Sequence, residues 1–394
     1  MNARSDATTV DRLAAALDAD LVALRRDLHR WPEPAGEERR TAARVAEELR
    51  AAGLSVTTGV GGHGVVAVLA GSGPGPTVAY RADLDAVVAD EVAESPFASR
   101  VPGVAHLCGH DLHTAIGVGV ARVLARARFD GTVVFVFQPA EETLQGARAM
   151  IDAGVLDRTR PDEVYALHCA PLPVGTLATM PGSGLPGLDS GHVDLTGPDA
   201  AAAGELLRAA IDGLTTVSRP ATPEEFARML DDIRTPDGPL ARFVHASTWL
   251  TSEEDGGARL RFWLRAWPQE RYPALRDEVR RLAAGARVEF AGPPFPAMVC
   301  PPDLSHAAAA HLRHVDAVAA VEVFPAAFPF NSEDFALFLR RVPGAMLYLG
   351  VANPEEGVNG VPHAPDFAAD DRAIGVGVRA VAELLLHRLD VLRG

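Results

Sequence analysis

The feature that most constrains the fold is the uninterrupted apolar run VVFVF at residues 133–137, which stops before Pro139. A strand with no polar alternation is covered on both faces, as in the centre of an α/β sheet. Helical and strand-like segments alternate around this run up to about residue 181. The strand-like segments are LSVTTGV, GVVAVLA, TVAYRADLD and DEVYALHCAP. We therefore predict an α/β fold, with a doubly wound catalytic domain around a central mixed sheet.

A chain of 394 residues exceeds what one core usually organises, so we expect two domains. The order of predicted strands and helices changes between about residues 187 and 296, where it follows a small α+β pattern. We predict a catalytic domain from residues 1–186 and 297–394, and an inserted α+β (ferredoxin-like) lid domain at 187–296. Residues 11–53 are expected to form two helices, and the segment ARLRFWLRAW is expected to be an edge strand of the lid.

Composition removes several classes of function. The net charge of −15 argues against nucleic acid and anionic membranes as partners. The chain has no lysine, which excludes Schiff-base and pyridoxal phosphate chemistry. The three cysteines, Cys108, Cys169 and Cys300, are irregularly spaced and do not suggest a disulfide framework. Neither a signal peptide nor a membrane span is evident, so we expect a cytoplasmic protein.

Polar side chains follow the predicted strands at the points where those strands end. Asp83 and Asp85 follow one strand, Glu141 and Glu142 follow the apolar run, and His168 follows a third. Ligands bind at the carboxyl ends of strands in open α/β sheets, so we expect these side chains to converge. Each of them alone can be explained without a function, as a turn residue, a solvated carboxylate or a hydrogen-bonded histidine at a strand end. Their convergence predicts a functional site.

The stretch AHLCGHDLH at residues 105–113 adds metal-type ligands to this set. Cys108 and His110 are one residue apart in a loop, and with the glutamates they form a donor set that suits zinc or manganese. One glutamate of the pair Glu141–Glu142 would bind metal and the other would act as a general base. Asp111 is expected to cap the helix that follows, and Cys169 to point away from the site.

Seven motifs, in order, resemble those of the N-acyl-amino-acid amidohydrolases. This is the hippurate-hydrolase and auxin-conjugate-hydrolase group of the aminoacylase/carboxypeptidase clan. The motifs are RRDLHRWPEPAGEE, YRADLDAV, HLCGHDLHTA, FQPAEE, ALHCAP, NSEDFALFL and VPHAPDF. The resemblance covers roughly residues 21–181 and 297–371. It implies a metal-dependent hydrolase that cleaves the amide C–N bond of an N-acyl amino acid or small peptide-like substrate.

The resemblance also implies roles for individual residues. Two divalent metal ions are implied, zinc or manganese in the first place, with cobalt or nickel compatible. Glu141 would be the general base, and Asp85 would orient a ligand, with Asp83 a weaker candidate. His106 and His113 would be supporting or structural, and Glu333 and Asp334 would support the pocket wall or cap the next helix. The implied metal ligands are Cys108, His110, Glu142, His168 and His363.

The lid departs from the family pattern. The family's Gly-Gly-His-Ala-Ala-x-Pro-His loop, which supplies a histidine, is absent here, and neither His192 nor His245 is an evident replacement. Loss of one oxyanion donor costs about 3 kcal/mol. The alternatives are therefore a catalytically impaired or regulatory relative that binds metal and ligand, or a hydrolase with shifted specificity. A cysteine hydrolase using Cys108 is a weaker alternative, because it leaves Glu141 without a role.

A homodimer through the lid domain is the partner arrangement that the resemblance suggests, besides a small-molecule substrate. The sequence leaves open which substrate is cleaved, which metal is bound and which oligomer forms.

Overall fold

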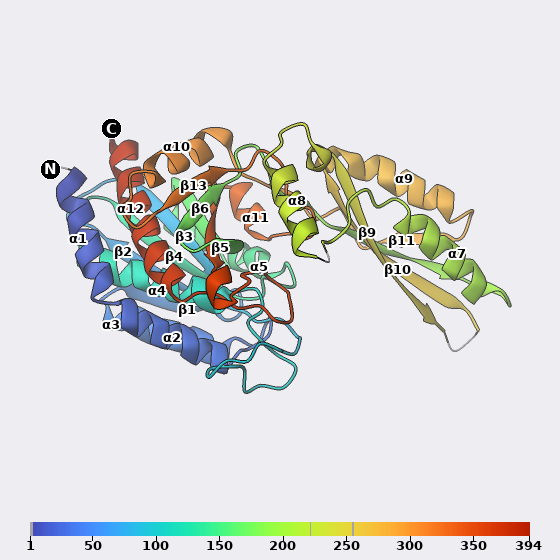
Figure 1. The fold of residues 1–394 in the computed structure, drawn as a ribbon, viewed down its shortest axis with the longest axis horizontal. Helices are drawn as coiled ribbons and strands as arrows, with labels where there is room; N and C mark the ends of the chain where they lie inside the picture. The colour runs from blue at the N-terminus through green and yellow to red at the C-terminus, as the bar shows by residue number, and fades with distance from the viewer. Residues whose placement is uncertain (1–2, 221, 254–255) are drawn as a thin grey trace. The chain divides into compact units, whose positions relative to one another are not determined.

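The computed structural model describes residues 3–220, 222–253 and 256–394. They form two compact units, which we describe separately (Figure 1). Unit 1 comprises the chain up to Thr179, with Cys300–Val323 and Leu337–Gly394. Unit 2 comprises Met180–Val299 and the segment Phe324–Ala336. Among the described residues, no helix has the length and apolar character needed to cross a bilayer.

Unit 1 contains an eight-stranded mixed sheet in the order β1-β2-β4-β3-β5-β14-β6-β13. The apolar run at residues 133–137 lies in β4, which is buried between β2 and β3 as predicted. β3, β4, β5 and β14 run parallel, whereas β1 and β2 are antiparallel additions at one edge. The strands are β1 (Ser55–Val60), β2 (Gly64–Ala70), β3 (Thr77–Asp83), β4 (Thr132–Gln138), β5 (Glu163–Pro173), β6 (Thr176–Thr179), β13 (Ala320–Val323) and β14 (Gly344–Ala352).

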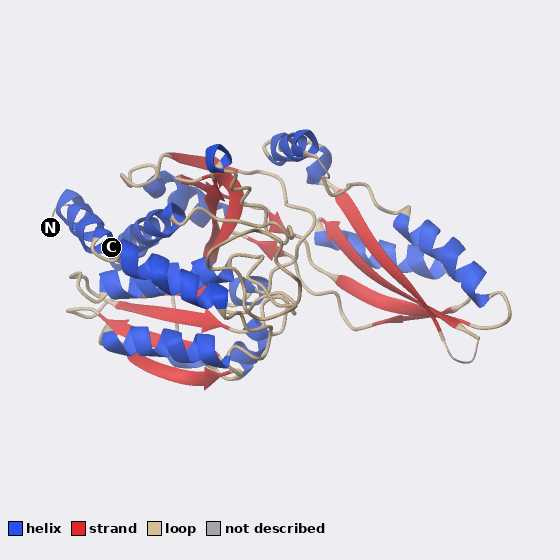
Figure 2. Ribbon diagram, turned by 60° about the horizontal axis from the view of Figure 1, so that its bottom comes forward, coloured by secondary structure: helices blue, strands red, loops and turns tan. Residues whose placement is uncertain are grey.

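Helices α3, α4, α12 and α10 contact one another in series and pack on the sheet of unit 1 (Figure 2). Almost every residue of α4 is buried, and a Cβ at Gly117 would lie 2.9 Å from the Phe137 ring, so this helix needs small residues to approach β4. The helices are α1 (Ala3–Ala15), α2 (Asp18–Arg30), α3 (Arg39–Ala51), α4 (His110–Leu124), α5 (Gly146–Asp152), α6 (Val155–Thr159), α10 (Pro302–Leu312), α11 (Phe335–Leu339), α12 (Arg372–Arg393) and the 3₁₀ turn η3 (Pro354–Glu356).

The prediction of two helices in residues 11–53 was wrong, because the first of them is broken. The Leu17 amide donates to the carbonyl of Ala14 rather than continuing the α-helical pattern, and the chain turns between α1 and α2. The break buries Ala14, Leu17 and Leu21 together in the core of unit 1. Core burial therefore overrides local helix propensity at this point.

Unit 2 contains a four-stranded antiparallel sheet in the order β11-β8-β10-β9. With α7 and α9, the chain order is β-α-β-β-α-β, which is the predicted ferredoxin-like pattern. ARLRFWLRAW was wrongly expected at an edge, because β10 pairs with both β8 and β9. The residues of β10 alternate between buried and more exposed positions, and β10 is an interior strand of the sheet. β9 is one of the two edge strands. The elements are β7 (Gly184–Leu185), β8 (Asp189–Leu195), α7 (Ala200–Asp212), α8 (Pro223–Ile233), η1 (Pro239–Ala241), β9 (Phe243–Ser252), β10 (Ala258–Trp267), η2 (Gln269–Arg271), α9 (Tyr272–Leu282), β11 (Arg287–Phe290) and β12 (Met298–Val299).

The topology of unit 1 explains where a site can form. Asp83 lies opposite Gln138 at the ends of the parallel strands β3 and β4, and β5 pairs with the other side of β3. The carboxyl ends of these strands therefore meet at one edge of the sheet, where α4 begins.

Candidate metal centre

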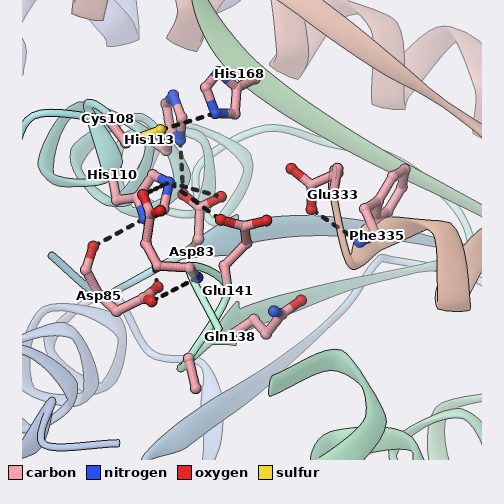
Figure 3. A network of polar contacts seen from close by, with 12 residues as sticks. Asp83, Asp85, Cys108, His110, His113, Gln138, Glu141, His168, Glu333 and Phe335 are labelled. Carbon is pink, nitrogen blue, oxygen red and sulfur yellow. Dashed lines mark hydrogen bonds and ion pairs between the residues drawn. The ribbon is translucent and has the colours of Figure 1, made fainter. Parts of the chain in front are cut away.

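The loop before α4 places Cys108 and His110 at the edge of the sheet in unit 1 (Figure 3). Gly109 between them has φ of 82°, and a Cβ there would lie 2.5 Å from the sulfur of Cys169. Only glycine fits this turn without strain. The Cys108 sulfur lies 3.4 Å from Nε2 of His168 on β5. His168 therefore joins the site from within a strand that continues to Pro173, and not from a strand end.

The hydrogen bonds of His110 and His168 define their tautomers. Nδ1–H of His110 donates to the Asp85 carbonyl at 2.9 Å, and Nδ1–H of His168 donates to the Cys169 carbonyl at 2.8 Å. Both carbonyls can only accept, so in the neutral form of each ring Nε2 keeps its lone pair. Such second hydrogen bonds orient metal-binding histidines in proteins.

The turn after β4 directs both glutamates towards His110, as predicted from Pro139. Glu141 Oε2 lies 3.8 Å and Glu142 Oε1 lies 3.7 Å from Nε2 of His110. The left-handed conformation of Ala140, with φ of 53°, makes this turn. Neighbouring carboxylates that would diverge in a strand are thereby brought to one place.

His363 reaches the same place from the loop before α12. Its amide donates to the Leu107 carbonyl at 2.7 Å, and its Nε2 lies 3.5 Å from Oε1 of Glu142. His363 also has a positive φ of 63°, a strained conformation that is typical of functional positions. Nothing in the local sequence beyond the family resemblance distinguishes this histidine from the others.

All the predicted ligands thus form one cluster in unit 1. The donor atoms lie within 4.8 Å of one another in each of three overlapping groups. Nε2 of His110 and Oε1 of Glu142 are buried and have no hydrogen-bond partner among the described residues. Unpaired buried polar atoms are costly, and a bound cation would satisfy them. The groups are Cys108–His110–His168, His110–Glu141–Glu142 and Cys108–Glu142–His363. The donor set therefore fits divalent metal ions.

The electrostatics of the cluster also favour cations. Burial raises the pKa of Cys108 well above its ordinary value, and the Glu142 carboxylate adds to the effect. Burial raises the pKa of Glu142 to about 7, although His110 opposes the shift. Burial disfavours the His110 imidazolium, but Asp83 and Asp85 outweigh it and raise the pKa of His110 to about 10. Neighbouring carboxylates contribute to each of these shifts, and a divalent cation would neutralise their charge.

Asp83 and His113 support the cluster from beneath. Asp83 is fully buried and accepts from Arg81 and from Nδ1–H of His113, each at 2.7 Å. Nε2 of His113 accepts the Cys169 amide at 2.8 Å, so both of its ring nitrogens are committed. His113 therefore has no lone pair left for a metal. Cys169 was expected to point away, but its thiol donates to the Cys108 carbonyl at 3.0 Å, where it helps to hold the ligand loop.

Asp111 was wrongly expected to cap α4. The helix begins after Gly109 without a side-chain cap, and Asp111 instead accepts from Arg25 at 2.7 Å and His29 at 2.8 Å. Burial opposes the charge on Asp111, but Arg25 and His29 outweigh it and hold its pKa far below the ordinary range. His106 is buried nearby, and burial lowers its pKa to about 4. In unit 2, Glu333 accepts the amide of Phe335 at 2.9 Å and so caps α11, as predicted.

Unit 2 contains a cationic group that was not predicted from the sequence, formed by Arg219 and Arg265 with the His245 ring beside them. Arg219 and His245 both lie against the Phe330 ring, at 5.3 and 5.1 Å, and His245 lies opposite Arg265 in the sheet. Burial, together with the charge of Arg219, lowers the pKa of Arg265 to about 10. Among the described residues, neither guanidinium has a carboxylate partner. The only sequence signal for this group is that no acidic residue lies two positions from Arg219 or Arg265.

An α/β domain with this donor set, and with a carboxylate beside it, defines the class of metal-dependent hydrolases. The family described as Peptidase family M20/M25/M40 matches residues 79–387. The chain belongs to this family, and the resemblance seen in the motifs is confirmed.

Several relatives of this chain have named activities or solved structures. N-acetylcysteine deacetylase of Bacillus subtilis (strain 168) is 30% identical over 96% of this chain and 99% of its own length. N-acetyldiaminopimelate deacetylase of Lacticaseibacillus casei (strain BL23) is 30% identical over 94% of this chain and 98% of its own. A dinuclear metal-binding M20 peptidase, the YXEP protein of B. subtilis, is 27% identical with a TM-score of 0.74, covering 95% of this chain and 99% of its own.

These comparisons confirm the predicted α/β fold and the predicted class of activity. The chain is a metal-dependent amidohydrolase that acts on C–N bonds. Two divalent metal ions are supported by the donor groups and by the dinuclear neighbour.

Proposed function

We propose that the chain hydrolyses the amide bond of an N-acyl amino acid or a small peptide-like analogue. The observation that carries the proposal is the turn at Glu141 and Glu142. It brings two neighbouring carboxylates to Nε2 of one histidine, with Glu141 in the place of the base. We propose Cys108, His110, Glu142, His168 and His363 as the metal ligands.

Glu141 moves the proton in this proposal. It takes a proton from the attacking water and later returns it to the nitrogen of the leaving amine. Asp85 holds this geometry by accepting the Glu142 amide at 2.9 Å and the Nδ1–H of His110 through its carbonyl at 2.9 Å. When bound, two divalent cations would polarise the scissile carbonyl and stabilise the negative charge that develops on its oxygen. Thiolate, imidazole and carboxylate ligands together favour zinc or manganese, with cobalt and nickel as compatible substitutes.

The cationic group of unit 2 is suited to binding an anion. Arg219 and Arg265 lack carboxylate partners within the described chain, and Nδ1 of His245 is buried without a partner. A small carboxylate is the kind of anion that such a group would bind.

The test is hydrolysis of a panel of N-acetyl and N-benzoyl amino acids, measured by release of the free amine. We expect turnover that a chelator abolishes and divalent metal restores. Matching substrates in which the carboxylate is amidated should be poorer. Metal binding without turnover on any panel member would favour the catalytically impaired relative instead.

We further propose that the protein is cytoplasmic and forms a homodimer through unit 2. The edge strand β9 presents a ten-residue backbone edge, and Trp249 on it is 44% exposed beside Trp263. Exposed edges of this length pair readily with a second strand. Sedimentation equilibrium of the purified protein would distinguish a dimer from a monomer.

A further inference from the structure

The proposed general base sits on a turn that the chain adopts at a cost. Ala140, directly before Glu141, has φ of 53°, and Leu144 has φ of 56°. Residues with a Cβ rarely adopt this left-handed conformation without support from their surroundings. The Ala140 carbonyl accepts the amides of Gln145 and Gly146, so these hydrogen bonds lie within the turn. The Ala140 amide bonds instead to a residue outside the turn.

That partner is Glu38, which comes from the segment before α3. Its Oε1 accepts the Ala140 amide at 2.8 Å across 102 residues of sequence, and also the Gly36 amide at 2.8 Å. On the other side of Glu141, Asp85 accepts the amide of Glu142 at 2.9 Å. Two carboxylates therefore hold the backbone immediately before and immediately after the proposed base.

Helix α3 does not account for the burial of Glu38. Glu38 occupies the N-cap position, but its side chain makes no capping hydrogen bond. Two amides of the first turn, those of Arg40 and Thr41, are accepted by Glu33 at 3.0 and 2.8 Å. Glu38 is fully buried, and its Oε2 has no partner among the described residues. A buried carboxylate is costly, so its contact with the catalytic turn requires a reason.

We infer that Glu38 is a positioning residue that holds Ala140 in its left-handed conformation and thereby aims Glu141 at the reacting water. The inference rests on the proposed role of Glu141. Because Glu38 acts through the backbone, it affects the rate of the chemical step and leaves metal binding unchanged.

Kinetics of four variants test this role. Glu38→Ala should lower kcat by about 10²-fold, with KM and bound metal close to wild type. Glu38→Gln keeps an oxygen that can accept the Ala140 amide, and should retain kcat within about tenfold. Glu33→Ala is the matched control, because it also removes a carboxylate that accepts two backbone amides in the same segment. It should lower the melting temperature and leave kcat unchanged.

A double mutant tests the backbone argument directly. Glycine adopts a positive φ without strain, so Ala140→Gly should make the hydrogen bond from Glu38 less necessary for this turn. The loss of kcat from Glu38→Ala should therefore be at least tenfold smaller in the Ala140→Gly background.

Additive losses, a change confined to KM, or an equal loss of kcat in Glu33→Ala would overturn the inference. If Glu38→Ala does not fold, a loss beyond tenfold in Glu38→Gln overturns it as well. Full activity of Glu141→Gln would instead overturn the proposed function, whatever the Glu38 variants show.

Discussion

The two units differ in how their charged side chains are satisfied. In unit 1, Asp83, Asp111 and Asp85 each bond to a histidine, an arginine or a backbone amide, and two unpaired buried atoms, Nε2 of His110 and Oε1 of Glu142, lie in the cluster of metal-type ligands. In unit 2, Arg219 and Arg265 gather positive charge without an acid partner in the described chain. One unit offers donors to cations, and the other offers donors to an anion. The comparison shows that the charged groups without a partner of opposite charge are the better guide to the ligand that each unit would bind.

The largest expected effect separates the two glutamates of unit 1. Glu141→Gln should reduce kcat by about 10²- to 10⁴-fold and keep its metal, because it removes the base and not a ligand. Glu142→Gln should lose metal at the same protein concentration, because it removes a ligand oxygen. Steady-state kinetics and elemental analysis of both variants provide the measurement. Metal loss in Glu141→Gln with retention in Glu142→Gln would reverse the two assignments.

A smaller effect tests the cationic group of unit 2. Arg265→Met should weaken the binding of a small carboxylate to the protein by about 10- to 100-fold in a calorimetric titration, since a charge-assisted hydrogen bond is worth about 1.5–3 kcal/mol. The metal content should not change. Arg261→Met, at an exposed position on the same strand, is the matched control and should behave as wild type. An equal loss of binding in the two variants would contradict an anion site in unit 2.

The smallest expected effect concerns acid stability outside the metal centre. His311 on α10 stacks on His387 of α12 with ring centroids 4.1 Å apart, and burial together with His387 lowers the pKa of His311 to about 4. The neutral form of His311 is favoured in the folded state. Its contribution to the free energy of unfolding is therefore fully present above about pH 6.5 and is lost as pH falls towards 4.

His311→Asn should remove that part of the acid sensitivity. Allowing for partial exposure, we expect about 1 kcal/mol less loss of unfolding free energy between pH 7 and pH 5 than in wild type. Urea unfolding at the two pH values is the measurement. His306→Asn, at an exposed position on the same helix, is the control and should follow wild type. Equal pH dependence in wild type and His311→Asn would contradict this account.

Much of unit 1 was predictable because its signals are local. The apolar run at residues 133–137 identified the central strand, polar residues at strand ends pointed to Asp85 and Glu141, and the one-residue spacing of Cys108 and His110 in a loop pointed to that pair. His363 and Glu38 were not predictable from local pattern. Each reaches the site across a long sequence separation through a loop, and periodicity carries no information about such contacts. The break between α1 and α2 was missed for a similar reason, since burial of Leu17 decided it.

Unit 2 was harder to predict because its strand order and its cationic group depend on contacts between distant segments. Alternating burial in β10 is as compatible with an edge strand as with an interior one, and only pairing with β9 distinguishes them. The position of Arg219 beside Phe330 depends on a segment more than a hundred residues further along the chain. No local pattern in the sequence therefore indicates this position of Arg219.

The central claim is that the cluster in unit 1 holds two divalent metal ions that the reaction needs. Elemental analysis of the purified protein, before and after dialysis against a chelator and paired with amine release from an N-acyl amino acid, tests it most directly. We predict two metal equivalents per chain, loss of turnover on chelation, and failure of His110→Ala to regain both on metal addition. Turnover that persists in metal-free protein, or in His110→Ala, would contradict the account.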